Sequence, residues 1–115
     1  MHPTIEKYKN AWEQRNVELL KDVFTHDAIY QYRPWEAARG LLEIEKYWAD
    51  KIIQRQTSVA FHVERERIFG NELWLEWNAI VGLNNQESPV KLSGTMIIEL
   101  ADDGRIRRLV EYYFY

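Results

Sequence analysis

The chain has 115 residues and a net charge of −3, with acidic and basic side chains interspersed, so it lacks the basic stripe of a nucleic-acid-binding surface. It contains no cysteine and only three scattered histidines, which excludes disulfides, thiolate chemistry and a metal site of recognisable ligand spacing. No apolar run approaches the roughly 20 residues of a membrane span, and the N-terminal segment does not resemble a signal peptide. We therefore expect a cytoplasmic protein without a cofactor, a membrane contact or a nucleic-acid partner.

Apolar residues recur at helical spacing in the first half of the chain. Three helices are predicted, over about residues 5–15, 17–24 and 42–53. Thr4 and Asn16 precede the first two helices and are of the residue types that cap helix N-termini. Residues 25–27 have turn chemistry, and residues 34–40 form a predicted loop.

Alternating apolar and polar residues, typical of half-buried strands, cover most of the remaining chain. Strands are predicted over about residues 28–33, 58–69, 72–83, 90–100 and 105–115. The 72–83 alternation is the most regular, because every second residue from Leu73 to Leu83 is apolar, and we expect this strand to be the central rib of the sheet. Helices followed by consecutive hairpins predict an α+β fold with the helices on one face of an antiparallel sheet. The absence of linkers and repeats predicts one domain, residues 1–115.

Several segments, taken in their order along the chain, resemble a known family. They are HDAIYQY at 26–32, the Arg39-Gly40 pair before the third helix, and DDGRIRRLVEYY at 102–113. The whole chain is similar to the nuclear transport factor 2-like superfamily, and within it to the SnoaL-like polyketide-cyclase group. The resemblance implies a single SnoaL-like domain shaped as a cone, in which a strongly bent antiparallel sheet packs on three helices and encloses a pocket. Family members include ketosteroid isomerases, dehydratases, epoxide hydrolases, cyclases and non-enzymatic proteins, so the fold alone does not select a function.

The ketosteroid isomerase branch shows what this chain lacks. The resemblance places Tyr8 where that branch has its oxyanion-hole tyrosine. It places Tyr32 where the general-base aspartate belongs, and Met96 where the protonated aspartic acid belongs. Without these two carboxyl groups the proton shuttle of those enzymes cannot operate, which excludes a typical ketosteroid isomerase.

The same resemblance directs Glu111 into the pocket, among aromatic side chains. Burial among aromatic residues raises the pKa of a carboxyl and tunes it for acid/base work, so Glu111 and Tyr8 are the candidate catalytic residues. The alternative for Glu111 is a structural carboxylate at the pocket mouth that pairs with Arg39 or Arg108, or that accepts a tyrosine hydroxyl. The alternative for Tyr8 is a buried member of an amphipathic helix stripe.

Aromatic residues make up 14% of the chain, which suits either a large core or a pocket for a flat organic ligand. The predicted ligand-binding residues are Trp12, Tyr30, Tyr32, Trp35, Trp48, Trp77, Met96 and Tyr113. Trp35 is included because it lies in a loop, where ligand contacts concentrate, whereas the others could equally fill a core. The expected partner is a small apolar or aromatic molecule. Two functions stay open: a cofactor-independent acid/base isomerase, dehydratase or cyclase, and a non-catalytic ligand-binding or dimerisation module with the same pocket.

The outward-facing positions of the sheet also carry apolar side chains. They include Trp74, Ile80, Ile97, Val110, Tyr112 and Phe114. This is more apolar surface than a monomer leaves in water, so we expect a homodimer that forms through the convex face of the sheet.

Overall fold

The structure, a computed structural model, describes residues 1–114, and Phe114 by its backbone alone. The helical elements are α1 (Pro3–Gln14), the 3₁₀ helix η1 (Val17–Asp22), α2 (Leu41–Trp48) and the π-helical turn η2 (Ala49–Ile53). The strands are β1 (Phe24–Arg33), β2 (Glu36–Arg39), β3 (Gln56–Phe69), β4 (Glu72–Leu83), β5 (Val90–Leu100) and β6 (Ile106–Phe114). This is the predicted α+β arrangement. None of the described helices is long and apolar enough to cross a membrane.

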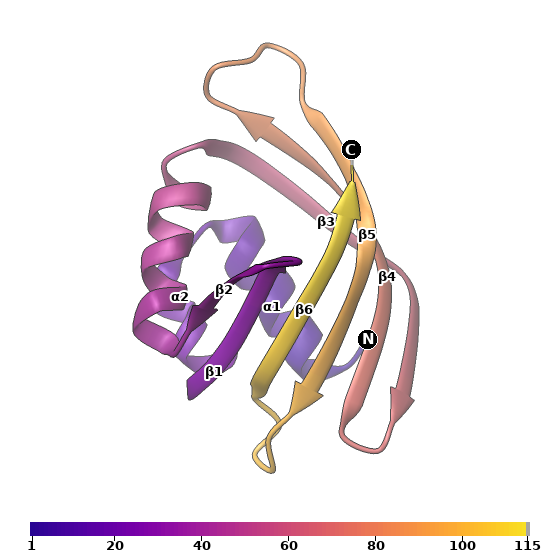
Figure 1. Ribbon diagram of the computed structural model, residues 1–115. Helices are drawn as coiled ribbons and strands as arrows, with labels where there is room; N and C mark the ends of the chain where they lie inside the picture. The colour runs from indigo at the N-terminus through magenta and orange to yellow at the C-terminus, as the bar shows by residue number, and fades with distance from the viewer. Residues whose placement is uncertain (115) are drawn as a thin grey trace.

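The six strands form one bent sheet in the order β2-β1-β6-β5-β4-β3. Figure 1 shows the sheet curving around α1 and α2, which lie on its concave side. Neighbouring strands are antiparallel except β1 and β6, which run parallel, so the wholly antiparallel sheet implied by the resemblance is corrected at this pair. The parallel pair arises because the chain builds β3 to β6 as successive hairpins and returns beside its first strand only at the end. The sheet does not close, and β2 and β3 are its edges.

Strand β4 has the predicted bounds and buries its regular apolar face. Its buried residues are Leu73, Leu75, Trp77, Ala79 and Val81. Strand β5 also has its predicted bounds, and it pairs with β4 in a continuous register from Glu72–Glu99 to Val81–Val90. The position of β4 differs from the prediction, however, because the β3–β4 hairpin ends the sheet and leaves β4 next to an edge rather than at the centre.

The cap of α1 differs from the prediction, and the cap of the second helix agrees with it. His2 rather than Thr4 caps α1, because the His2 Nδ1 atom accepts the backbone N–H of Thr4 at 3.1 Å. The Thr4 side chain is occupied elsewhere, since its hydroxyl donates to the carbonyl oxygen of Gly104. The Asn16 side chain caps η1 as predicted, by accepting the backbone N–H of Glu18 at 3.0 Å.

Sheet pairing overrides the local turn signals around β1. Residues 25–27, predicted as a turn, belong to β1, and residues 36–39 of the predicted loop form β2. Ile29 to Gln31 pair with β2 on one side and with β6 on the other, and the Gly40 N–H donates to the carbonyl of Ala28 at 2.7 Å. Residues 25–27 themselves lie in an irregular stretch of β1, between the Phe24–Ile106 and Ile29–Arg108 pairs, so pairing on either side of them keeps the turn-forming residues within the strand.

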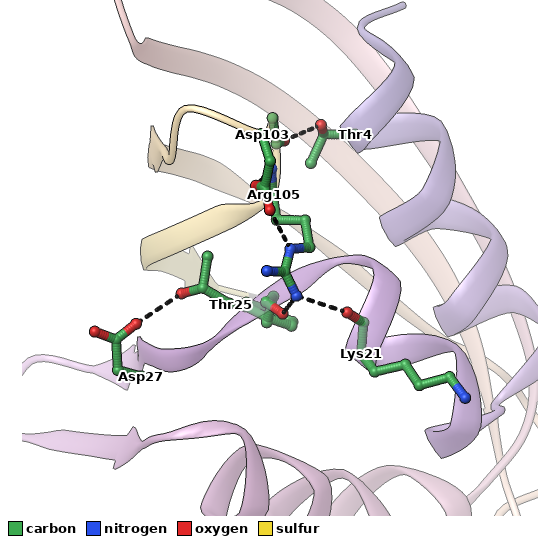
Figure 2. A network of polar contacts seen from close by, with 8 residues as sticks. Thr4, Lys21, Thr25, Asp27, Asp103 and Arg105 are labelled. Atoms are coloured by element: carbon green, nitrogen blue, oxygen red, sulfur yellow. Dashed lines mark hydrogen bonds and ion pairs between the residues drawn. The ribbon is translucent and has the colours of Figure 1, made fainter.

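A polar network anchors the turn before β6 to the N-terminal part of the chain (Figure 2). The Thr4 hydroxyl donates to the carbonyl of Gly104 in that turn. The Nη1 atom of Arg105 donates to the carbonyl oxygens of Lys21 and Phe24, at 3.3 and 3.5 Å. These contacts tie the start of β6 to the end of η1 and the start of β1. They therefore help to set the register of the strand that carries the candidate acid.

Part of the predicted convex face is exposed. The clearly exposed apolar residues among its predicted members are Trp74, Ile80 and Tyr112. Ile97 is half-buried, and Val110 is buried, because it lies between paired neighbours on β5 and β1 in the middle of the sheet. The side chain of Phe114, and Tyr115 at the end of the last predicted strand, lie outside the described residues.

Candidate functional site

A cavity of about 500 Å³ lies on the concave side of the sheet. Six of the predicted site residues line it: Tyr8, Trp12, Tyr30, Trp77, Glu111 and Tyr113. They come from α1, β1, β4 and β6, which are distant in sequence. Across the sheet, Trp77 and Tyr113 both pair with Gly94 of β5, and the absence of a side chain there lets the two rings approach to 6.4 Å between centroids.

The other predicted ligand contacts lie away from the cavity wall. Trp48 and Met96 are fully buried in the core behind it, because the helix layer and the β4–β5–β6 register enclose them on all sides. Trp35 is 94% exposed in the turn between β1 and β2 and is not part of the cavity wall. Tyr32 is half-buried and stacks on Tyr47, which does line the cavity, with 4.0 Å between the ring centroids. Two strand residues predicted to point inward, Tyr32 and Met96, are half-buried and buried, so inward parity does not distinguish a cavity wall from filled core.

Glu111 is a buried carboxylate with two tyrosine partners. The Tyr8 hydroxyl donates to its Oε1 atom at 3.0 Å, and the Tyr30 hydroxyl donates to its Oε2 atom at 3.2 Å. Among the described residues no cation forms an ion pair with it: Arg108 pairs with Glu99 instead, at 3.5 Å. Of the arrangements considered from sequence, the geometry matches a carboxylate that accepts tyrosine hydroxyls and not one paired with arginine.

Burial sets the protonation behaviour of this group. Removal from water raises the pKa of Glu111 from an ordinary 4.5 to about 7, while the hydrogen bonds from Tyr8 and Tyr30 partly oppose the rise. Burial, and then the nearby Glu111 charge, raise the pKa values of both tyrosines well above 10. The two hydroxyls therefore stay protonated as donors, and Glu111 is the member of the trio that exchanges a proton near neutral pH.

Aromatic packing holds the two donors in place. The Tyr8 ring meets Trp12, Phe24, Trp48 and Phe61 edge to face, with ring centroids 5.8 to 6.5 Å apart. The Tyr30 ring meets Tyr47 in the same manner at 5.6 Å. Edge-to-face contacts fix ring orientation as well as burying area, so each hydroxyl is aimed at the carboxylate by the core around it.

The polar end of the cavity was not predicted as a site. We call it the mouth, and its residues, all exposed, are Arg33, Lys51, Arg55, Asn84, Asn85 and Gln86. Gln56, half-buried just inside, accepts the indole N–H of Trp12 at 2.9 Å. The available sequence signal was weak: Lys51 falls on the apolar stripe of the third predicted helix and Arg55 lies four residues further on. Only the tertiary fold brings these residues together with Arg33 from β1.

The fold is an open, bent sheet packed on helices, and a buried acid lies in an aromatic cavity between the two layers. This combination is typical of a class of small α+β proteins that bind small molecules. The chain belongs to the SnoaL-like domain family, whose model matches residues 5–109. None of the curated proteins compared with the chain in sequence matches it. Among residues 1–114, no group of three or more histidine, aspartate or glutamate side chains is placed to hold a metal ion.

Solved structures share the fold at low sequence identity. A hypothetical protein from Catenulispora acidiphila with a ketosteroid isomerase-like fold, in complex with trimethylamine, has a TM-score of 0.84 at 14% identity, over 96% of this chain and 84% of that one. A putative SnoaL-like polyketide cyclase from Shewanella denitrificans has a TM-score of 0.82 at 13% identity, over 97% and 88%. An LEH-like epoxide hydrolase from M. tuberculosis has a TM-score of 0.81 at 17% identity, over 98% and 81%. At these identities the likeness establishes the fold and leaves the chemistry to the site.

Proposed function

We propose that this protein binds a small apolar or aromatic molecule in the cavity and exchanges a proton with it through Glu111. The reaction class is cofactor-independent acid/base chemistry next to a carbonyl, that is, an isomerisation, dehydration or cyclisation. The observation that carries the proposal is a buried carboxyl on the cavity wall whose pKa lies near 7 and whose hydrogen-bond partners among the described residues are two tyrosine hydroxyls. A group with this pKa is populated in both protonation states at neutral pH, as a general acid/base requires.

The roles of the three polar groups follow from their hydrogen bonds. Ionised Glu111 would accept a proton from a carbon or hydroxyl of the ligand, and the same group would return it at another atom. Tyr8 and Tyr30 stabilise the ionised form through the bonds to its two oxygens. Either hydroxyl could instead donate to a ligand oxygen when Glu111 is protonated, which would support charge that develops on a carbonyl.

A non-catalytic binding module is the second candidate function. The observation in its favour is that both oxygens of Glu111 already accept a hydrogen bond from the protein, as in a purely structural network. In that case the aromatic wall would still bind a ligand, but no proton transfer would depend on the carboxyl. The Glu111→Gln variant discussed below separates the two candidates.

Ligand binding can be tested through the five tryptophan indole N–H signals in a nitrogen–proton NMR spectrum. Titration with 2-naphthol, a planar and mostly apolar probe, should shift the signals of Trp12 and Trp77, because both rings line the cavity. The signals of Trp35 and Trp74, which are exposed elsewhere, serve as internal controls and should not move. Shifts confined to Trp35 or Trp74 would contradict the proposal. Mass spectrometry of the purified protein would identify a ligand that copurifies.

We also propose that the protein is a homodimer through the convex face of its sheet. The support is the group of exposed apolar side chains there, Trp74, Ile80 and Tyr112, beside the Arg65–Glu76 ion pair at 3.1 Å. Sedimentation at micromolar concentration should give twice the chain mass of 13.9 kDa. Ile80→Lys should shift the protein toward the monomer, whereas Leu42→Lys, on the helix side, should not. A wild-type protein that sediments as a monomer would refute this.

A further inference from the structure

The cavity is polarised from one end to the other. Its inner end is walled by buried aromatic residues and holds Glu111, the one acidic residue on the wall among those that the structure describes. Its mouth carries three cationic side chains, Arg33, Lys51 and Arg55, and no acid. We infer that the ligand is amphipathic and anionic: a flat apolar body that reaches toward Glu111, with a carboxylate that the three mouth cations bind. This inference rests on the proposed small-molecule-binding function and specifies its substrate class.

Two of the three charges at the mouth have no acidic partner among the described residues. Many lysine and arginine side chains outside the mouth have an acidic partner, as in Lys46–Asp50 at 3.3 Å and Arg105–Asp103 at 2.8 Å. Among the described residues, Lys51 and Arg55 form no ion pair and no side-chain hydrogen bond. Arg33, by contrast, is engaged: its guanidinium hydrogen-bonds the Tyr113 side chain and pairs with Glu36 at 3.7 Å. Through Lys51 and Arg55 the mouth therefore presents positive charge that no acidic side chain of the described residues neutralises.

Among the described residues, none of the mouth cations forms an ion pair with the inner acid. The pKa of Glu111 is raised by its burial and lowered by the hydrogen bonds from Tyr8 and Tyr30. Arg33 instead acts on the tyrosines near the mouth, where its charge opposes the raised pKa of Tyr47. The cations are thus not part of the acid/base trio. A ligand that uses both ends must span the cavity, with its charged group at the mouth and its reacting atoms near Glu111.

Besides the cations, the mouth carries neutral hydrogen-bond donors that could bind the carboxylate of a ligand. Asn85 and Gln86, in the loop between β4 and β5, add amide donors beside the cations. Arginine binds carboxylates through a planar pair of N–H groups, and lysine adds a mobile point charge. Because all three cations are exposed, we expect a moderate preference that salt weakens, and not the tight grip of a buried ion pair.

The test compares two probes that differ only in charge, 2-naphthoate and its neutral amide, 2-naphthamide. Binding is measured at about pH 6, one unit below the pKa of Glu111, so that this group is mostly uncharged and does not repel the anion. At about 0.01 M salt, 2-naphthoate should bind about tenfold more tightly than the amide, and the preference should shrink at about 1 M salt. The double variant Lys51→Gln/Arg55→Gln should remove most of the preference and leave binding of the amide unchanged.

A second double variant controls for net charge. Lys46→Gln/Arg67→Gln removes the same two charges from exposed positions outside the cavity and should leave the preference intact. Equal affinity for the two probes, or an equal loss in both double variants, would overturn the anionic ligand class but not binding in the cavity. If neither probe shifts the Trp12 or Trp77 indole signal, the proposed binding function itself fails, and this inference fails with it.

Discussion

Replacing Glu111 by glutamine should make the folded protein more stable above neutral pH and flatten the dependence of its stability on pH. Burial raises the pKa of this group in the folded state to about 7, against 4.5 in the unfolded chain. Between these values the folded protein holds a proton that the unfolded chain has released, so the wild-type free energy of unfolding falls as pH rises. The full loss is about 3 kcal/mol, from the difference between the two pKa values. Urea unfolding at several pH values across this window measures it.

Glutamine is the appropriate replacement because it keeps the shape and both polar contacts. Its carbonyl oxygen can accept one tyrosine hydroxyl, and its amide can donate to the oxygen of the other. Glu87→Gln, which removes an exposed carboxyl from the β4–β5 loop, is the matched control and should leave the pH dependence unchanged. Tyr30→Phe should act in the opposite sense to Glu111→Gln. It removes a hydrogen bond that lowers the pKa of Glu111, so the loss of stability should extend to higher pH. A wild-type protein whose stability is flat across this window would show that Glu111 ionises as an exposed acid does.

The Glu111→Gln variant also decides whether the protein is an enzyme or a non-catalytic binding module. If Glu111 is the general acid/base, glutamine should lower the rate by about 10²–10⁴-fold, the usual size of such a contribution, while 2-naphthol still binds. Glu111→Gln should then be more stable but less active than the wild type, because active sites often keep a buried group that destabilises the fold when the reaction needs it. An activity that survives the substitution would make Glu111 a structural partner of Tyr8 and Tyr30, and the non-catalytic module would then be the better description.

Strand alternation predicted the parts of this fold in which one face of a strand is buried. The bounds of β4 and β5 follow from their period, because a register slip of one residue would expose the whole apolar face. Turn chemistry predicted less well. His26 and Asp27 are turn-forming residues, yet they lie within β1, in an irregular stretch between the Phe24–Ile106 and Ile29–Arg108 pairs that β1 makes with β6.

The candidate site could be predicted only as far as side-chain direction. Parity, together with the family resemblance, directs both Glu111 and Met96 inward, and the two residues are in fact cross-strand partners. Whether an inward side chain meets a cavity or fills the core depends on how closely the helices approach at that point, which no local pattern contains. The mouth was missed for a related reason. Lys51 falls on the apolar stripe of a predicted helix and Arg55 just beyond the end of that helix, and only the fold places them on one cavity wall with Arg33 of β1.

Gly94 is the position at which a single methyl group should be most harmful to the fold. A Cβ atom there would overlap the carbonyl oxygen of Tyr112 and lie 2.8 Å from the Cα atom of Tyr113, both in the backbone of β6. Backbone atoms of a paired strand cannot rotate away, so Gly94→Ala must push β5 and β6 apart. We expect a loss of about 3 kcal/mol in the free energy of unfolding, at the upper end of overpacking effects. Because Tyr113 lines the cavity, ligand binding should weaken as well.

Gly82→Ala, on the neighbouring strand β4, provides the matched comparison for Gly94→Ala. Its new Cβ atom would also be crowded, at 2.6 Å from the Ser58 hydroxyl oxygen and 2.7 Å from that of Thr57. These are the ends of side chains, which can rotate to another staggered position, so the cost should stay below about 1 kcal/mol. Replacing glycine by alanine restricts the unfolded chain to a similar extent at both sites, so the difference between the two variants reports the folded state. Urea unfolding midpoints at constant m-value measure that difference. Equal losses at the two positions would show that β6 can yield at Gly94, and that the close approach of β5 and β6 is not what requires glycine there.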